Sequence, residues 1–391
     1  MKYNFDKVID RSGTSAEKVE GLKHIWGRTD LIPLWVADMD FATAPFVTDA
    51  IRKRCENEVL GYTGKPDSYY NAIINWVKQR YDLIVTKEVI NFVPGIVPGI
   101  GMAMNCFTQK GDKVMIQPPV YHPFAWVTTR NERTLVINPL KWENGMYRMD
   151  LDAFREQIKG CKLFILCNPH NPGGVVWTEA ELRAIADICY DEKVLVFSDE
   201  IHADLPLPPH THRPFATVSE KARMNSVTFM SPSKAFNMPG LSASHALIFN
   251  EDLRKRFRIY MDAGELDMGH VFAFLSVEAA YSHGTEWLDQ CLAYIQGNID
   301  FVDEFLKKHA PKIKAIRPEA SYLVWLDCRE LELSQKDLNE FFVDKAHLAL
   351  NDGEMFGKEG IGFMRLNVAS PRCIIEKAMK QLADAYQLYI K

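Results

Sequence analysis

The 391-residue chain lacks the features that mark secreted and membrane proteins. Its eight cysteines include no CxxC pair, which argues against a disulfide framework and predicts reduced thiols. No apolar run approaches the roughly 18 residues of a membrane-spanning helix. Residues 1–13 have no apolar stretch like that of a signal peptide. We therefore expect a cytoplasmic protein that does not bind a membrane.

Long basic runs and metal-ligand clusters are also missing. The net charge is -5, and no lysine- or arginine-rich segment offers a surface for nucleic acid. No internal repeat, low-complexity segment or metal-ligand spacing is present, so we predict no metal. With 47% hydrophobic and 25% charged residues, the chain has the composition of a globular protein. Its length predicts two or three domains.

Between residues 89 and 250, short apolar segments alternate with segments of helical periodicity. This alternation predicts an α/β domain whose mostly parallel sheet is covered by helices on both faces. Helices are expected at 96–108, 151–159 and 179–191. Strands are expected at 89–93, 113–117, 134–138, 162–167, 194–198, 226–230 and 246–249.

The rest of the chain predicts a second, smaller domain. Residues 270–308 have a helical pattern, and 310–391 combine strands at 322–326 and 363–366 with a helix from about residue 371. Such a mixture is typical of an α+β domain. The N-terminal segment is expected to pack on this domain or to cross to a partner subunit. The predicted units are an N-terminal segment (1–45), a large domain (46–290) and a small domain (291–391).

Two charged residues follow predicted strands of the large domain. In parallel sheets, ligands bind beyond the carboxyl ends of the strands. Lys234 follows strand 226–230 and can form an imine with an aldehyde cofactor. Asp199 follows strand 194–198 and can keep a pyridine nitrogen protonated. Each charge alone is more typical of a solvated strand end, but together with the residues below they predict pyridoxal 5'-phosphate (PLP).

Other strand ends predict contacts with the cofactor phosphate. The hydroxyls of Ser231 and Ser233 precede Lys234. Ile96 and Val97 open a predicted helix, whose free backbone N–H groups attract anions. Gly95, just before them, would let the backbone approach the phosphate. A Pro-Gly pair before a helix is by itself a weak signal.

Four further side chains are candidates for the site. Asn171 could donate its amide to the phenolate oxygen of the cofactor, or belong to an ordinary turn. Tyr121 could stack on the ring, or pack in the core. His202 could support the phenolate oxygen or cap local structure. Arg365, a cation in an apolar strand, could bind a substrate α-carboxylate, or form an internal salt bridge.

These residues resemble those of the fold type I PLP enzymes, the aspartate aminotransferase superfamily. Within it, the chain is most similar to the branch of cystathionine β-lyase-like C–S lyases. The resemblance covers nearly the whole chain, and the versions of its motifs at 34–41 (Leu-Trp-Val-Ala-Asp-Met-Asp-Phe) and 198–202 (Ser-Asp-Glu-Ile-His) are typical of that branch. The other motifs lie at 61–63, 93–95, 167–174, 231–241 and 364–367.

The resemblance implies an α/β protein with a seven-stranded mixed, mostly parallel sheet in the large domain and a smaller α+β domain. It also implies a homodimer with its sites at the subunit interface, where Tyr62 reaches the phosphate of the neighbouring subunit. Tyr121 would stack on the cofactor ring. Ala37 and Asn171 would help to position an amino-acid substrate near Arg365.

Two positions depart from the wider aminotransferase pattern and agree with the lyase branch. His202 stands where those enzymes usually have tyrosine, and Ser242 where they usually have arginine. We therefore predict β-elimination from L-cystathionine or a related L-cysteine S-conjugate, which yields pyruvate, ammonia and a thiol. Lys234, Asp199 and Tyr121 would be the catalytic residues. An aminotransferase is the alternative, and a PLP-binding regulator without turnover is a third hypothesis.

Overall fold

The computed structural model describes residues 3–389 and is built around a seven-stranded sheet. The strand order is β2-β10-β9-β8-β7-β3-β4. Strand β10 runs antiparallel to both of its neighbours, whereas the pairs from β9 to β4 are parallel. The predicted mixed, mostly parallel sheet is thus confirmed. Its strands are β2 (Ile90–Val93), β3 (Lys113–Ile116), β4 (Thr134–Ile137), β7 (Leu163–Cys167), β8 (Leu195–Asp199), β9 (Ser226–Met230) and β10 (Ser244–Leu247).

Helices cover both faces of this sheet because its inner strands are apolar on both sides. In β7, Leu163 and Ile165 face one helix layer, and Phe164 and Leu166 face the other. The first layer comprises α4 (Ile96–Phe107), α5 (Pro123–Arg130) and α9 (Glu251–Asp262). The second comprises α3 (Asp67–Tyr81), α6 (Leu151–Gln157), α7 (Glu179–Asp191) and α10 (Val271–His283).

The predicted helix at 270–308 is two helices, α10 and α11 (Thr285–His309), which meet at Gly284. A Cβ atom on Gly284 would lie 2.3 Å from the carbonyl oxygen of Ala280 and 2.3 Å from the Phe236 ring. Only glycine therefore fits where the two helices meet. The sequence pattern did not reveal this break, because it depends on contact with Phe236, which is distant in sequence.

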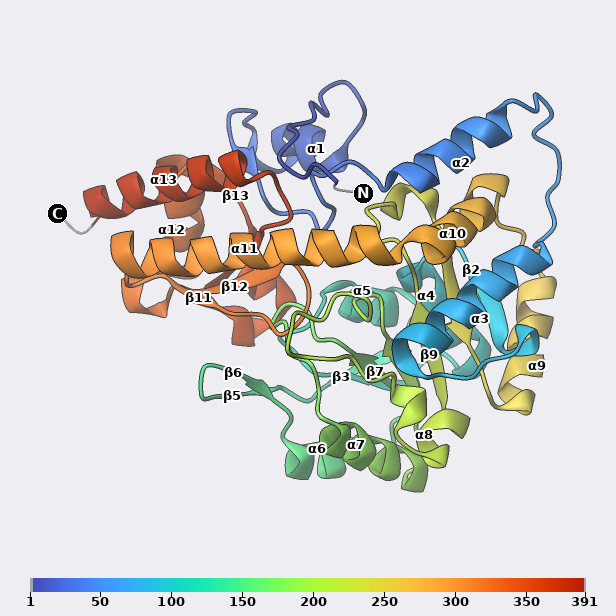
Figure 1. Cartoon of the computed structure of the whole chain (residues 1–391). Helices are drawn as coiled ribbons and strands as arrows, with labels where there is room; N and C mark the ends of the chain where they lie inside the picture. The colour runs from blue at the N-terminus through green and yellow to red at the C-terminus, as the bar shows by residue number, and fades with distance from the viewer. Residues whose placement is uncertain (1–2, 390–391) are drawn as a thin grey trace.

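A second, four-stranded antiparallel sheet lies in the C-terminal part of the chain, with the order β11-β12-β15-β14. Helix α11 (orange) runs from α10, beside the large sheet, towards β11 and β12 (Figure 1). The boundary proposed at residue 290 falls inside this continuous helix. The elements of this region are β11 (Lys314–Ile316), β12 (Leu323–Asp327), α12 (Gln335–Glu340), β13 (Leu348–Ala349), β14 (Asn351–Asp352), β15 (Phe363–Asn367) and α13 (Arg372–Tyr389).

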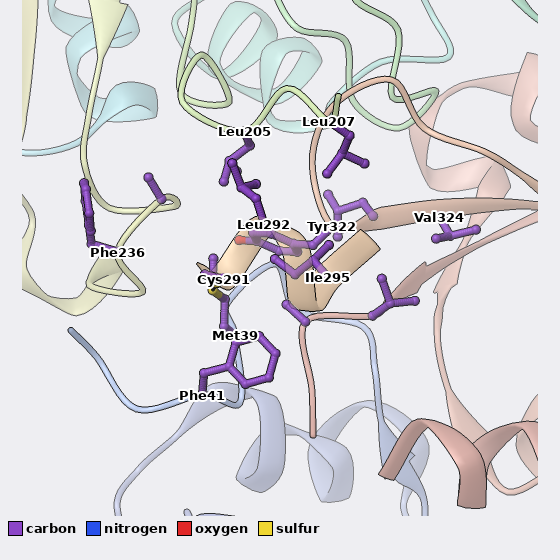
Figure 2. Packing of buried hydrophobic residues seen from close by; sticks show 14 of the residues in the cluster. Met39, Phe41, Leu205, Leu207, Phe236, Cys291, Leu292, Ile295, Tyr322 and Val324 are labelled. Atoms are coloured by element: carbon purple, nitrogen blue, oxygen red, sulfur yellow. Dashed lines mark hydrogen bonds between the residues drawn. The ribbon is translucent and has the colours of Figure 1, made fainter. Parts of the chain in front are cut away.

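The N-terminal segment lies against the small sheet region, since β1 (Ile32–Pro33) pairs in parallel with β13. Its apolar residues join the largest hydrophobic cluster of the molecule. Figure 2 shows Met39 and Phe41 beside Cys291 of α11, with Tyr322 nearby. The segment is therefore packed against α11 and the small sheet region. The remaining elements are α1 (Glu17–Trp26), α2 (Pro45–Cys55), α8 (Glu220–Met224) and the hairpin of β5 (Lys141–Glu143) and β6 (Met146–Arg148).

All eight cysteines are free thiols. Within residues 3–389, no helix combines the length and the apolar character needed to cross a bilayer. The same residues contain no group of three or more histidine, cysteine, aspartate or glutamate side chains arranged to hold a metal ion.

His245 of β10 provides a test of this packing. Its ring is fully buried and neither nitrogen has a hydrogen-bond partner among the described residues, so burial lowers its pKa from 6.5 to about 3. Below pH 6.5, His245 binds a proton in the unfolded chain but not in the folded chain. The free energy of unfolding therefore decreases as the pH is lowered. We expect His245→Leu to remove up to about 1.4 kcal/mol of this loss per pH unit, measured by urea unfolding between pH 6.5 and 5.

His24→Leu is the matched control, because His24 is exposed and its replacement should leave the pH dependence as in the wild type. An unchanged pH dependence in His245→Leu would contradict the buried, neutral state of this ring.

Candidate active site

A cavity of about 210 Å³ opens at the edge of the sheet where the parallel strands end. Cys167 and Asp199 end β7 and β8 and are register partners, and Lys234 follows β9. Because β10 runs antiparallel, its first residue, Ser244, reaches the same edge. The predicted residues that line the cavity are Ala37, Gly95, Ile96, Val97, Tyr121, Asn171, Asp199, His202, Ser233 and Lys234.

The amine of Lys234 points to the N-terminal segment. Its Nζ donates a hydrogen bond of 2.6 Å to the carbonyl oxygen of Ala37. Burial lowers the pKa of Lys234 to about 8, although Asp38 and Asp199 oppose this shift. A substantial fraction of the amine is therefore neutral in mildly alkaline solution, and a neutral amine is the form that acts as a nucleophile or base.

The carboxylate of Asp199 is only 3% exposed. Burial, with a smaller contribution from Glu200, raises its pKa to about 7, and one backbone N–H group, that of Ile201 at 3.0 Å, opposes this. No lysine or arginine pairs with it in the described part of the chain. A buried carboxylate without a counter-charge is costly, so this position favours a cationic ligand group such as a protonated pyridine nitrogen.

Another part of the cavity wall suits an anion. Helix α4 begins there with Ile96 and Val97, and no side chain caps it. Gly95 adopts a φ of 147°, in the region that favours glycine. The N–H groups at such a helix start are free to bind phosphate. Ser233 lines this cavity as well.

Ser231 does not line the cavity. Its Oγ donates a hydrogen bond of 2.7 Å to the carbonyl oxygen of Ala243 and accepts one of 3.1 Å from the backbone N–H of Ser233. Its single proton is therefore already donated within the wall of the cavity.

Arg365 of β15 is 3% exposed and reaches Asn171 from the small sheet. Its guanidinium donates to Oδ1 of Asn171 (3.0 Å), to Oδ1 of Asn351 (2.5 Å) and to the carbonyl oxygen of Trp35 (3.1 Å), while Nε has no partner. None of the carboxylates in residues 3–389 forms an ion pair with it, so the internal salt bridge considered above is absent. Burial lowers its pKa to about 10, and the charge is left for an external carboxylate.

Tyr121 and His202 both face the cavity. Burial, and then the nearby Asp199, raises the pKa of Tyr121. Burial lowers the pKa of His202 to about 3, so the ring is neutral. The His202 side chain makes no hydrogen bond with the described residues, so it does not cap local structure.

Ala37 of the motif at 34–41 lines the cavity, and two asparagines anchor the backbone around it. Nδ2 of Asn367 donates to the carbonyl oxygens of Val36 (2.7 Å) and Asp38 (2.6 Å). Nδ2 of Asn237 donates to the carbonyl oxygen of Met39 at 3.0 Å. Asn367 belongs to the small sheet region and Asn237 to the loop after Lys234, so both sides of the site hold this segment.

The acidic residues of the motif at 34–41, Asp38 and Asp40, belong to a network of ion pairs that the sequence did not reveal. Lys18 of α1 is fully buried, and its Nζ lies 2.8 Å from Asp40 and 3.6 Å from Asp38. Arg11 pairs with the same two carboxylates at 3.2 Å and 2.6 Å. The two acids therefore attach the N-terminal residues to the wall of the cavity.

Tyr62 does not reach the cavity of its own chain. It is 97% exposed and lies in a separate groove formed by residues 60–65 and 267–271.

Sequence reasoning did not assign a role to several lining residues. Ser244 had a usable signal, because it begins a strand that the sequence placed at 246–249, two residues too late. Cys167 was expected only as a reduced thiol at the start of the motif at 167–174. The unassigned lining residues are Pro94, Pro98, Cys167, Ile201, Pro239, Ser242, Ala243 and Ser244.

Residues 29–382 match the family described as aminotransferase class I and II. The chain belongs to this family. It is 38% identical to the cystathionine beta-lyase PatB of Bacillus subtilis (strain 168), over 98% of this chain and 99% of that protein. Its structure is similar to cystalysin of Treponema denticola, which contains PLP (TM-score 0.96, 33% identity, all of both chains). It is also similar to the PLP-bound C–S lyase of Staphylococcus hominis (TM-score 0.91, 35% identity, 98% of each chain).

The anchoring of the wall can be tested with Asn367→Asp. This change turns a donor into an acceptor that faces two carbonyl oxygens, so we expect a loss of about 3 kcal/mol or more in the free energy of unfolding at pH 7. Urea unfolding measures the loss. Asn144→Asp, in an exposed turn, is the control and should stay within about 0.5 kcal/mol of the wild type. Equal stability of the two variants would contradict the anchoring role.

Proposed function

We propose that this protein is a PLP-dependent C–S lyase that catalyses β-elimination from L-cystathionine or a related L-cysteine S-conjugate. The observation that carries the proposal is the presence, in one cavity, of a lysine amine and a buried carboxylate that forms no ion pair with the described residues. The relatives named above as lyases, which match over nearly the whole chain, support the reaction type.

The residues of the cavity fit PLP at each end. Lys234 would hold the aldehyde carbon, and Asp199 would face the pyridine nitrogen, whose positive charge compensates its buried carboxylate. The backbone N–H groups of Ile96 and Val97 and the hydroxyl of Ser233 would bind the phosphate. When bound, PLP supplies an electron sink for the negative charge that develops at the substrate Cα.

The protein supplies the proton transfer and the orientation. Arg365 would bind the α-carboxylate through Nε, which is unpaired, and through a guanidinium that has only neutral partners. Neutral Nζ of Lys234 would take the proton from the substrate Cα. The Cβ–S bond would then break, and the sulfur would leave as a thiolate, which takes up a proton to give the thiol. Tyr121 would stack on the ring, and Asn171, held by Arg365, keeps its amide nitrogen for the phenolate oxygen.

We also propose a homodimer in which Tyr62 of each subunit enters the site of the other and contacts its phosphate. Three features support this arrangement: Tyr62 is 97% exposed, the neighbouring Val59 and Leu60 are 72% and 59% exposed, and Met268 on the other side of the same groove is 42% exposed. A cytoplasmic location is also part of the proposal, and the eight free thiols support it.

The first experiment mixes the PLP-loaded protein with L-cystathionine, without any keto acid, and measures pyruvate and free thiol together. We expect catalytic release of both in equal amounts. If neither appears, and an amino acid with a keto-acid acceptor gives amino transfer instead, the reaction is that of an aminotransferase.

In the same assay, Lys234→Ala should lose turnover and the near-visible absorbance that PLP gains when it is linked to a lysine. Lys308→Ala, at an exposed position, should keep both. Full activity of Lys234→Ala would contradict the assignment of this residue.

Arg365→Lys should lower kcat/KM for L-cystathionine about 10- to 100-fold, because one bidentate charge-assisted contact is lost. For a thioether amine that lacks the α-carboxylate, the same variant should differ little from the wild type. Arg133→Lys is the matched control, since Arg133 is also a buried arginine with neutral partners. An equal effect of Arg365→Lys on both substrates would contradict carboxylate binding.

A further inference from the structure

The phosphate end of the cavity contains few donors. Of the described residues that line the cavity, Lys234 alone has a cationic side chain, and its amine points to Ala37. Helix α4 offers the N–H groups of Ile96 and Val97, but the next residue, Pro98, has none. A phosphate monoester has three terminal oxygens that accept hydrogen bonds. Two backbone donors leave this group incompletely bound, so further hydroxyl donors are needed.

Ser244 is placed to supply such a donor. It is 3% exposed and lines the cavity, and its hydroxyl has no hydrogen-bond partner within residues 3–389. In the sheet it is the register partner of Val93, the last residue of β2 before the turn into α4. Ser244 therefore lies beside the start of that helix.

The alternation of β10 gives the direction of the side chain. Residues two apart in a strand face the same side of a sheet. Ala246 packs in the same hydrophobic cluster as Ile96 and Ile100 of α4, whereas Leu247 packs in the cluster on the opposite face. Ser244 thus faces the side on which α4 lies, and Ser244 and the first residues of that helix line the same cavity.

Ser231 has a different role from Ser244. Its proton is donated to the carbonyl oxygen of Ala243, the residue directly before Ser244. This bond joins the end of β9 to the start of β10 and fixes the backbone from which the Ser244 side chain projects. Ser231 acts on the cavity through Ser244.

We propose that Ser244 is a binding residue for the phosphate of the cofactor and that Ser231 is its positioning residue. The inference rests on the proposed function, because it takes the bound phosphate monoester to be that of PLP. It extends the phosphate-binding set from Ser233, Ile96 and Val97 to the first residue of the antiparallel strand.

The test compares two ligands that differ only in the phosphate. Apoenzyme is titrated with PLP and with pyridoxal, and both dissociation constants are measured by absorbance. Ser244→Ala should weaken PLP binding about 10- to 100-fold, the effect of a hydrogen bond to a charged group, and should leave pyridoxal binding within about twofold. Inorganic phosphate should compete with PLP more weakly in this variant than in the wild type.

Ser276→Ala is the matched control, because the Ser276 hydroxyl is also buried and also lacks a partner among the described residues, but lies in α10. It should bind PLP as the wild type does. Ser244→Cys keeps the shape of serine with a weaker donor and serves if the alanine variant does not fold. Equal losses of PLP and pyridoxal in Ser244→Ala, or no loss of PLP, would overturn the assignment of Ser244.

A double-mutant cycle separates the two roles. If Ser231 acts through Ser244, Ser231→Ala weakens PLP binding in the wild type but adds little in the Ser244→Ala background. Additive losses would mean that Ser231 contacts the phosphate by itself and would overturn the positioning role. A wild-type protein that binds no PLP at all would instead refute the proposed function, so the two failures are distinguishable.

Discussion

The parallel pairing of β7, β8 and β9 is the constraint on which the site depends. Parallel strands bring their carboxyl ends to one edge, and the register of β7 and β8 places Cys167 directly beside Asp199. The turn after β9 then brings Lys234 to the same edge. Strand β10 runs the other way, so the same edge receives its first residue, Ser244, instead of its last. The directions of these strands thus bring Cys167, Asp199, Lys234 and Ser244 to one edge of the sheet.

Burial at this edge sets the electrostatics of the site. It raises the pKa of Asp199 to about 7 and lowers that of Lys234 to about 8. Near neutral pH, the ionised form of Asp199 and the protonated form of Lys234 are therefore both less favourable in the folded protein than in the unfolded chain. A ligand that brings a positive charge to Asp199 and bonds covalently to the amine of Lys234 relieves both costs. The two buried groups whose charged forms are costly in the folded protein are therefore those that favour PLP.

The sheet could be predicted from the sequence because its strands are short apolar runs, each followed by a turn or a helix start. The residues that follow the strands could be predicted for the same reason. The small sheet was recognised only at β12 and β15, since β11 and β14 are too short to form a pattern. The break at Gly284 was missed because it depends on contact with Phe236, which is distant in sequence. The roles of Asn237 and Asn367 were missed because their hydrogen bonds join segments far apart in the chain.

Ala37 shows why local patterns are insufficient for this site. Its carbonyl oxygen accepts from Nζ of Lys234 at 2.6 Å and from the hydroxyl of Tyr322 at 3.0 Å. One residue thus joins the loop after β9, the N-terminal segment and the small sheet region. Because Asn367 and Asn237 hold the same segment from both sides, the lysine amine meets a carbonyl whose position is fixed by all three parts of the fold. A change in the packing of the small sheet would therefore shift the backbone of residues 36–39. Because the carbonyl that Lys234 contacts belongs to this segment, the change would also alter the position of the lysine amine.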